Sequence, residues 1–391
     1  MAGVKGGAAG GAKRHAANAV GAWSSRLVEL SHRIHSHPEP AFEETRASAW
    51  VADALSAAGF DVQHGCYDLP TAVRASVGTG PLHIGICAEY DALPEIGHAC
   101  GHNIIAAAAV GAAVGLAGLA DDLGLTVTVL GTPAEEGGGG KILMLERGAF
   151  AGLDAAMMVH PAAVEMAAMP GSAVAQFEAS YRGKPAHAGA YPELGVNAAD
   201  AMTVAQVAIG LLRQQTGAGD RVHGIVTQAG TAPNVIPDAS HGRWIVRAST
   251  LEALAELKPR VRRCFEAGAV ATGCELTVTP LGPDYADLRP DAGMLRLYRA
   301  NAEALGRVFP DLPGGAPAGA ATDMGNVSHV VPSIHPMLGL DCLPAVNHQP
   351  EFTAACATPA ADRAVLDGAT AMAWTAIDLA HAASAQRASH G

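Results

Sequence analysis

The spacing of hydrophobic residues in the first part of the chain alternates between helical and strand-like. Apolar residues recur every three or four positions between residues 22 and 58, where Pro38 and Pro40 divide the pattern into two predicted helices. Continuous apolar runs predict buried strands at residues 82–87, 125–130 and 155–159. Further helices are predicted over residues 104–120 and 141–146. Strands that alternate with helices indicate an α/β domain with a mostly parallel sheet covered on both faces.

The pattern changes after about residue 168. The next segments predict the order strand, helix, strand, strand, helix, strand, over residues 173–182, 197–215, 222–228, 241–248, 251–267 and 275–280. This is the order of a ferredoxin-like α+β unit. From Leu288 the chain returns to helix, strand (334–338) and a terminal helix (359–384). We therefore predict an α/β domain of residues 21–168 and 286–391, interrupted by an inserted α+β domain of residues 169–285.

Two segments raise the question of targeting or membrane insertion. Residues 1–20 are rich in Gly and Ala and carry three basic residues, but they lack the apolar core of a secretory signal. We expect a disordered tail there. The uncharged run 104–120 is mostly Ala, Gly and Val and is shorter than the ~20 strongly apolar residues of a membrane span. A buried helix is the better interpretation.

Composition narrows the function classes. Of 391 residues, 49% are hydrophobic and 16% are charged, which supplies a large core and excludes disorder for most of the chain. A net charge of -12 argues against nucleic acid as a partner, and no polybasic stretch suits an anionic membrane. The seven cysteines have no disulfide-framework spacing, which favours a reducing compartment. We expect a cytoplasmic protein.

Candidate metal ligands follow three of the predicted strands. Glu89, Asp91 and the loop 97–103, which contains Cys100 and His102, come after the strand at 82–87. The pair Glu135 and Glu136 follows the strand at 125–130, and His160 follows the strand at 155–159. The carboxyl ends of parallel strands share one edge of a sheet, where ligands bind. Cysteine, histidine and carboxylate side chains bind borderline metals such as zinc, so a metal centre is predicted at this edge.

Each of these signals has a simpler interpretation when it is taken alone. A single histidine such as His160 at a strand end is more often structural, and Glu135 and Glu136 beside four glycines also fit a solvated turn. Their joint placement is more specific. Adjacent glutamates suit two roles, because one can ligate metal while its neighbour acts as a general base toward water.

Six segments in order along the chain resemble peptidase family M20. They are HSHPEPAFEE (35–44), AEYDALPEIGHACGHN (88–103), GTPAEEGGGGK (131–141), GKPAHAG (183–189), TAPNVIPD (231–238) and NHQPEF (347–352). The sequence is most similar to the amidohydrolase branch, which includes aminobenzoyl-glutamate hydrolase, hippurate hydrolase and auxin-conjugate hydrolases. The GHACGHN and PAEEGGGGK forms resemble the dipeptidase-like members of that branch. The resemblance runs from about residue 23 to 382.

The resemblance implies two divalent metal ions per subunit. The implied ligands are Cys100, His102, Glu136, His160 and His348. It also implies Glu135 as the general base and Asp91 as an acidic residue that supports the ligands. A thiolate favours zinc, with manganese, cobalt and nickel as alternatives. The family usually carries Asp where this chain has Asn103, which cannot supply that negative charge.

For the inserted domain, the resemblance implies a lid and dimerisation role. His187 matches a histidine that reaches the active site of the partner in a homodimer and polarises the scissile carbonyl. Asn234 and Arg247 have the thirteen-residue spacing of a substrate-contacting pair in the glutamate-releasing carboxypeptidases of the family. An arginine fork suits a substrate carboxylate, and the alternative interpretation of Arg247 is a surface salt bridge.

The resulting expectation is a metal-dependent hydrolase of an amide bond. The substrate would be a small molecule with a free carboxylate: a dipeptide, an N-acyl amino acid or an aminobenzoyl-glutamate-like compound. Water activated by the metals would attack, with Glu135 as the base. The alternatives are an enzyme for another amide conjugate and a catalytically silent binding or regulatory protein. A phosphate-binding use of the four glycines is excluded, because Lys141 is followed by Ile142 rather than Ser or Thr.

Overall fold

The computed structural model describes residues 2–310 and 320–390, which form two compact units. The first unit contains residues 2–169, 289–310 and 326–390, and the second contains residues 170–288 and 320–325. The short segment 320–325 was expected in the first domain. It belongs to the second because the Ser172 N–H donates to the carbonyl of Ala320 (2.9 Å) and Gly325 packs against the backbone of Ala286.

The first unit is built on a six-stranded sheet. Its order is β1 (Asp61–His64), β2 (Val73–Val77), β4 (Leu125–Thr132), β3 (Leu82–Glu89), β5 (Ala155–Met157) and β11 (Ser333–Ile334). The four strands from β4 to β11 are parallel, and β1 and β2 are antiparallel additions at one edge. The mostly parallel sheet is confirmed. The edge strands were missed because β1 is polar and exposed and β2 has no continuous apolar run.

Helices cover this sheet and pack tightly on one another. The helices of the first unit are α1 (Ala2–Ala22), α2 (Ser24–His35), α3 (Thr45–Ala57), α4 (His102–Ala117), α5 (Gly140–Glu146), α8 (Ala292–Ala304), α10 (Pro350–Ala355) and α11 (Pro359–His390). Helix α9 (Met324–Ser328) begins in the segment that belongs to the second unit and ends in the first. Helix α4 is buried along residues 102–116. Its glycines allow close approach, because a Cβ at Gly111 would lie 2.7 Å from that of Ala369. A buried helix is therefore confirmed, and no helix among the described residues has the length and apolarity to cross a membrane.

The N-terminal segment is helix α1, so the expected disordered tail over residues 1–20 is wrong for its described residues. Ala16 and Val20 are buried in the core of the first unit. The Lys13 ammonium lies 2.7 Å from Asp378 Oδ2, and Trp374 Nε1–H donates to the Lys13 carbonyl. The sequence pattern did not indicate the buried face of α1, because its small alanine side chains differ little in hydrophobicity from the glycines around them.

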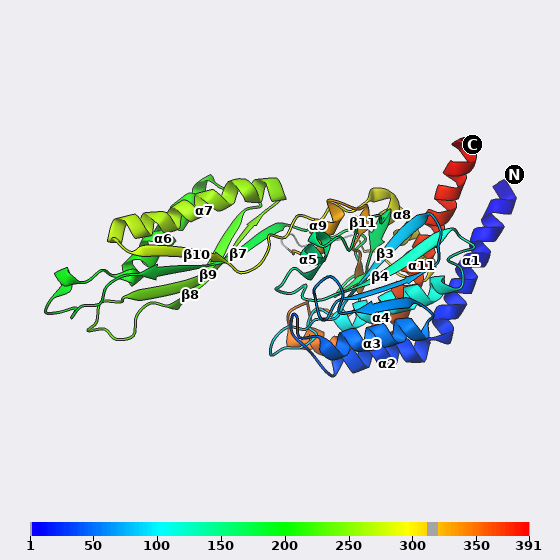
Figure 1. Ribbon diagram of the computed structural model, residues 1–391, viewed down its shortest axis with the longest axis horizontal. Coiled ribbons are helices and arrows are strands. Elements are labelled where there is room, and N and C mark those ends of the chain that lie inside the picture. The colour runs from blue at the N-terminus through cyan, green and yellow to red at the C-terminus, as the bar shows by residue number, and fades with distance from the viewer. Residues whose placement is uncertain (1, 311–319, 391) are drawn as a thin grey trace. The chain divides into compact units, whose positions relative to one another are not determined.

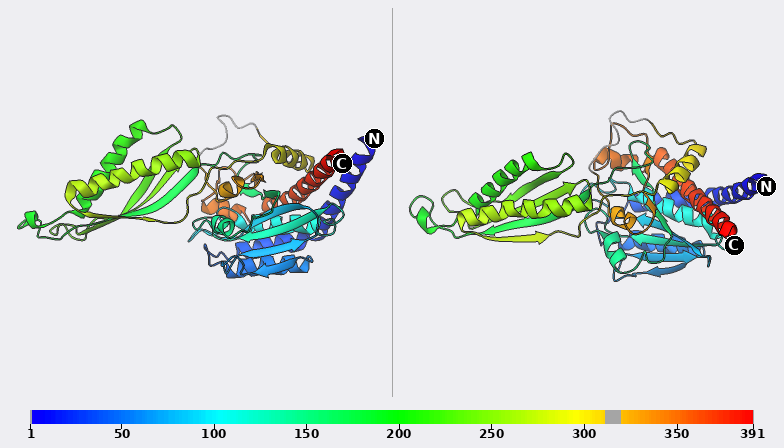
Figure 2. Two further views of the ribbon diagram at one scale, coloured as in Figure 1. Left: turned by 45° about the horizontal axis from the view of Figure 1, so that its top comes forward. Right: turned by 90° about the horizontal axis from the view of Figure 1, so that it is seen from above.

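The second unit has a four-stranded antiparallel sheet with two helices on one face (Figure 1 and Figure 2). Its elements follow the order β7 (Ala173–Arg182), α6 (Ala198–Leu212), β8 (Arg221–Gln228), β9 (Ala239–Ala248), α7 (Leu251–Thr272) and β10 (Glu275–Pro280). The predicted element order is confirmed, and the sheet order is β10-β7-β9-β8. Asn197 caps α6, since its Oδ1 accepts from the N–H groups of Ala199 and Asp200.

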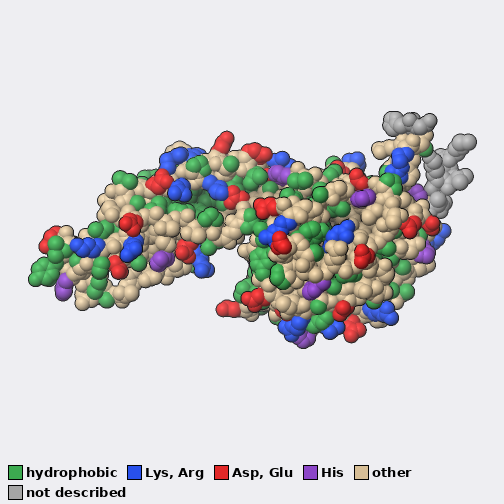
Figure 3. Space-filling view, viewed as in Figure 1, with side chains coloured by type: hydrophobic (Ala, Val, Ile, Leu, Met, Phe, Trp, Pro, Cys, Tyr) green, Lys and Arg blue, Asp and Glu red, His purple; other side chains and the backbone are tan. Residues whose placement is uncertain are grey.

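Charged side chains are mixed on the surface shown in Figure 3. Basic and acidic groups alternate over this face, and the described residues there form no continuous basic surface of the kind that nucleic acid requires. All seven cysteines are free thiols.

Candidate metal centre

The predicted ligands lie where strands end at one edge of the sheet of the first unit. Cys100 and His102 flank Gly101, which adopts a left-handed φ of 73° at the start of α4. A Cβ at this glycine would lie 2.8 Å from the ring of Pro161 and 3.1 Å from Cys356 Sγ. A side chain there would push apart the segments that carry the ligands, so the glycine in HACGH is needed for close packing.

The other predicted ligands lie in a turn, at the start of a short strand and at a residue with positive φ. Glu136 lies in the turn after β4, two residues beyond Ala134, which has a φ of 59°. His160 begins β6 (His160–Ala162), which pairs in parallel with β12 (Met337–Gly339). His348 has a φ of 68°, and its N–H donates to the carbonyl of Ala99. Non-glycine residues at positive φ are uncommon and collect at functional sites.

The structure brings all five predicted ligands together. The ligand atoms of Cys100, His102 and His160 lie within 4.8 Å of one another, and those of Cys100, Glu136 and His348 do so as well. His348 Nε2 is 3.1 Å from Cys100 Sγ and 3.6 Å from Glu136 Oε2. The two groups therefore share the Cys100 sulfur. His348 is the exposed member of the set and marks the side that is open to solvent.

Divalent metal fits this donor set. His102 Nε2 and Glu136 Oε1 are buried and make no hydrogen bond to any described residue. Buried polar atoms are almost always satisfied, so such orphaned donor atoms call for an ion. Thiolate, imidazole and carboxylate together suit zinc and its neighbours in the first transition row.

Asp91 fixes the orientation of two ligands. Its Oδ1 accepts a hydrogen bond from His102 Nδ1–H (2.9 Å), and its Oδ2 accepts one from the backbone N–H of Glu136 (2.9 Å). The first bond leaves His102 Nε2 directed at the other ligands. Burial acts to raise the pKa of Asp91, but the imidazole of His102 outweighs it and lowers that pKa. Asp91 therefore remains an anion.

Glu135 reaches the same cluster from the turn after β4. Its carboxylate is buried and its Oε2 lies 3.9 Å from His102 Nε2. It also belongs to a third group of donor atoms within 4.8 Å of one another, with Glu89 and His102. Glu135 is thus beside the predicted ligands, as a base acting on water there must be.

Sequence reasoning gave no role to the buried residues Lys141 and His335 at this centre, and it named Glu89 only among the candidate metal ligands. Lys141 Nζ lies 2.5 Å from Glu89 Oε1, and both side chains are fully buried. Burial acts to raise the pKa of Glu89, but Lys141 is the main cause that lowers it to about 2. The ring of His335 lies 5.2 Å from that of His160, and both of its nitrogens are buried. The position of Glu89 at the end of β3 was a usable signal, whereas nothing local marked His335.

The Asn103 side chain acts as a hydrogen-bond donor, which an aspartate at this position could not do. Its Nδ2 donates to Ser31 Oγ (2.8 Å) and to the carbonyl of Cys356 (3.0 Å). A carboxylate at this position would lack both donor groups. The amide therefore ties α4 to α2 and to the end of α10, and this explains Asn in place of the expected Asp.

Glu44 supports the turn that carries the two glutamates. Its Oε1 accepts from the N–H of Ala134 (2.8 Å), and its Oε2 accepts from Thr71 Oγ1 (2.8 Å). The side chain is fully buried. Burial and the charge of Asp91 raise the pKa of Glu44 to about 7.

Replacing Glu44 with glutamine is expected to change how stability depends on pH. A raised folded-state pKa favours the protonated form, so the stabilising contribution of Glu44 is fully present below pH 4.5 and is lost as the pH rises through about 7. The loss should approach ~3 kcal/mol of unfolding free energy. Urea unfolding at pH 5 and pH 8 measures this loss. From pH 5 to pH 8, the unfolding free energy of wild type should fall more than that of Glu44→Gln. Equal pH slopes for the two proteins would contradict the assignment.

The second unit carries the remaining predicted residues. His187 is exposed, and its Nδ1 accepts from the N–H groups of Gly189 (3.2 Å) and Ala190 (3.1 Å). Because Nδ1 accepts these bonds, the proton of the neutral ring is on Nε2, which is therefore a hydrogen-bond donor. Asn234 lies beside it, because its carbonyl accepts from the N–H of Ala188 (3.0 Å). His187 and Asn234 therefore form one exposed patch.

Arg247 lies far from Asn234 along the second unit. Asn234 precedes β9, whereas Arg247 lies near the other end of this strand, opposite Val174 and Arg221. Eight extended residues from Ala239 separate them by on the order of 25 Å. The thirteen-residue spacing therefore does not bring the two residues together within this chain, and their contact with a substrate stays a prediction. Arg247 is half-buried, and burial lowers its pKa from the usual value.

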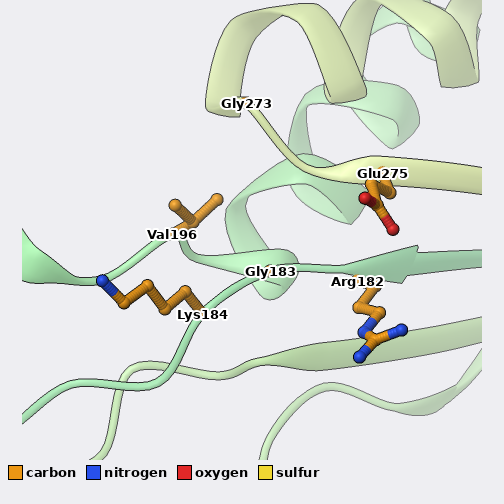
Figure 4. Close-up of a pocket in the computed structure, with 6 residues that line it drawn as sticks. All are labelled: Arg182, Gly183, Lys184, Val196, Gly273 and Glu275. Carbon is orange, nitrogen blue, oxygen red and sulfur yellow. The ribbon is translucent and has the colours of Figure 1, made fainter.

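Among the cavities formed by described residues, two lie away from this centre. One, of about 310 Å³, is in the second unit and is lined by Arg182, Gly183, Lys184, Val196, Gly273 and Glu275 (Figure 4). The side chains of Arg182 and Lys184 point in different directions there, so they do not converge on one ligand. The other, of about 590 Å³, is in the first unit, where Arg307 already contacts Glu165 and Asp367. None of the candidate metal ligands lines either cavity.

The chain is similar to known hydrolases in sequence and in fold. The chain is 40% identical over 386 residues to Xaa-Arg dipeptidase of Mus musculus, covering 94% of this chain and 88% of that protein. It is 34% identical over 278 residues to one subunit of the p-aminobenzoyl-glutamate hydrolase of Escherichia coli (strain K12), covering 65% and 57% of the two chains. A Bacillus subtilis crystal structure, described as a dinuclear metal-binding peptidase from the M20 family, matches with a TM-score of 0.69 and 23% identity over 92% of this chain and 98% of that one.

The similarity to the Bacillus subtilis structure establishes the fold. The family assignment rests on the sequence. The model of peptidase family M20/M25/M40 matches residues 85–365, which include all five predicted ligands and Glu135. With a relative at 40% identity over most of the chain, this protein belongs to peptidase family M20/M25/M40.

Proposed function

We propose that this M20 hydrolase is a metal-dependent dipeptidase that acts on small dipeptides with a free carboxylate. The observation that carries the proposal is the convergence of five metal-donor side chains beside Glu135. Among the candidate substrates, dipeptides are favoured over N-acyl amino acids and aminobenzoyl-glutamate, because a relative named Xaa-Arg dipeptidase matches along 94% of the chain. A dipeptide with a basic carboxyl-terminal residue is accordingly the first substrate to test.

Two ions would be held by the two overlapping donor groups. Cys100, His102 and His160 would hold one, and Cys100, Glu136 and His348 the other. Zinc is the first choice because of the shared thiolate, and a reducing compartment such as the cytoplasm would keep that thiol available. When bound, the ions supply Lewis-acid polarisation of the substrate carbonyl and lower the pKa of water.

The residues of the chain then divide the chemistry between them. Glu135 takes a proton from the attacking water and delivers it to the leaving amine, so that a neutral amine departs. Asp91 holds His102 in one tautomer and keeps the backbone of Glu136 in place. The Nε2–H of His187 in the partner of a homodimer would donate to the carbonyl oxygen as negative charge develops there. Arg247 would bind the substrate carboxylate, with Asn234 of the partner assisting His187.

The homodimer is proposed to form through the second unit. Strand β8 is at the edge of its sheet, and Ile225 on this strand is 64% exposed. Helix α6 presents Val207 and Leu211, which are 59% and 70% exposed. An open strand edge beside exposed apolar side chains suits pairing with a second copy of the same surface.

A mixed-subunit experiment tests the role of His187. A His187→Ala protein and a Glu135→Gln protein are each expected to be inactive. If His187 acts in the partner, a mixed dimer has one intact site, and random mixing should restore about a quarter of the wild-type rate. Activity of the reassorted mixture is measured with dimer exchange verified by mass. No recovery in a verified mixed dimer would show that the histidine does not act across the dimer.

The reaction itself is tested on a pooled panel of dipeptides, N-acyl amino acids and aminobenzoyl-glutamate. Protein reconstituted with zinc, manganese or cobalt is incubated with the pool, and loss of each compound is followed by mass spectrometry. Selective loss of dipeptides, abolished by a chelator, is the expected result. Turnover of another class alone would move the substrate assignment to that class. A folded protein with two bound ions and no turnover of any compound would contradict the proposed activity.

A further inference from the structure

The four glycines before Lys141 bring this residue into the interior of the first unit. Gly139 has a left-handed φ of 65° and immediately precedes α5. A Cβ at Gly140 would lie 1.8 Å from the carbonyl oxygen of Pro133, so only glycine lets the helix start against the turn that carries Glu135. Lys141, in the first turn of α5, is fully buried as a result. The four glycines thus allow the close packing that places the Lys141 ammonium in the interior.

Glu89 connects this cation to a metal ligand. Its Oε1 lies 2.5 Å from Lys141 Nζ, and its Oε2 lies 3.4 Å from His102 Nε2. The latter is the nitrogen that Asp91 leaves free for metal. Glu89 is nearer to that nitrogen than Glu135 (3.9 Å) or Glu136 (4.0 Å). By distance alone, the Glu89 carboxylate is therefore the best placed of the three to bind an ion held by His102.

We propose that Lys141 is a positioning residue that holds Glu89 as a counter-charge beside the metal centre and prevents it from becoming a metal ligand. This inference rests on the proposed function, since it assumes an ion at His102. A buried carboxylate needs a partner cation, and Lys141 supplies one that is fixed by the backbone of α5. While Glu89 is paired with the Lys141 ammonium, it does not bind the ion held by His102. That position on the ion then stays free for substrate and water. Without Lys141, the carboxylate would turn to the metal ion, which is a cation within its reach.

The test uses cobalt as a spectroscopic probe in the full-length protein. Lys141→Met removes the ammonium but keeps the length of the side chain. Its cobalt dissociation constant is expected to fall by about tenfold, the scale on which groups around a metal ligand act. Its visible absorption should weaken, because an added carboxylate raises the coordination number. Lys141→Arg, which keeps the charge, should retain the wild-type spectrum.

A second substitution isolates the carboxylate. Adding Glu89→Gln to Lys141→Met removes the released donor, so cobalt affinity and the spectrum should return to wild-type values. A folded Lys141→Met protein with the wild-type spectrum and affinity would overturn the proposal, as would weaker cobalt binding that Glu89→Gln does not restore. If Lys141→Met does not fold, the double variant Lys141→Met/Glu89→Gln, in which both charges are removed, still tests the proposal. A tenfold loss of cobalt affinity in this double variant would show that Glu89 is a ligand in the native protein and would overturn the proposal.

These readouts separate the inference from the proposed function. Cobalt binding and spectra are measured without substrate, so wild type that binds cobalt but cleaves no amide contradicts only the proposed activity. Wild type that binds no cobalt would overturn both the activity and the positioning role.

Discussion

Replacing Glu135 with glutamine is expected to lower kcat by about 10³-fold while two metal ions remain bound. Glutamine has nearly the same shape as glutamate but cannot accept a proton at neutral pH. Glu135 is one of the buried carboxylates beside His102, and the predicted ligands Cys100, Glu136 and His348 form their own group without it. The substitution should therefore remove proton transfer and leave the metal content intact.

The measurement pairs steady-state kinetics with metal analysis of the same sample. Glu256→Gln is the matched control, because Glu256 is exposed on α7 of the second unit. This control should keep wild-type kcat. A Glu135→Gln protein that keeps both ions and at least a tenth of the wild-type kcat would remove Glu135 as the base. Loss of an ion in this variant would instead make Glu135 a ligand.

The centre of this fold was predictable because its signals are local. Continuous apolar runs such as residues 82–87 and 125–130 mark buried parallel strands, and the register of β3 with β4 brings their ends together. The residues directly after each strand must then lie at one edge of the sheet. The positions of Cys100, Glu136 and His160 at this edge follow from topology without any knowledge of distances.

The Lys141–Glu89 pair shows what such reasoning misses. Lys141 begins the helix predicted over residues 141–146, and nothing in that pattern indicates burial, because lysine is almost never fully buried without a partner. Its burial depends on how Gly140 packs against Pro133, which is a tertiary contact. The sequence separates Glu89 from Lys141 by a whole helix and strand, α4 and β4. Their pairing therefore has no periodic or short-range signal.

The residues of the second unit show that a spacing in the sequence does not by itself fix a distance in space. Asn234 and Arg247 are thirteen residues apart in the sequence, but most of the interval is the extended strand β9. A strand separates its ends, whereas a turn or a helix would have brought these residues closer. A fixed sequence spacing carries spatial meaning only once the intervening structure is known.

The shared thiolate provides the second large expected effect. Replacing Cys100 with serine should weaken metal binding by at least about 100-fold and abolish activity, since both donor groups contain Cys100. Serine is not ionised at neutral pH, so it offers the metals no anionic ligand. Cys342→Ser is the control, because Cys342 is partly exposed and bonds only the carbonyl of Ala345 among the described residues.

The pH dependence of metal binding distinguishes loss of the thiolate from simple misfolding. Burial, followed by the charge of Glu136, raises the pKa of Cys100 well above its usual value, so the metal-free protein carries a thiol. Metal must displace that proton, and wild-type affinity should therefore rise with pH. Competition with a chelator between pH 6 and 8 measures the slope, which should be shallower in Cys100→Ser because one displaced proton is gone. A folded Cys100→Ser protein with two ions and the wild-type slope would show that Cys100 is not a ligand, and the two donor groups would then have no atom in common.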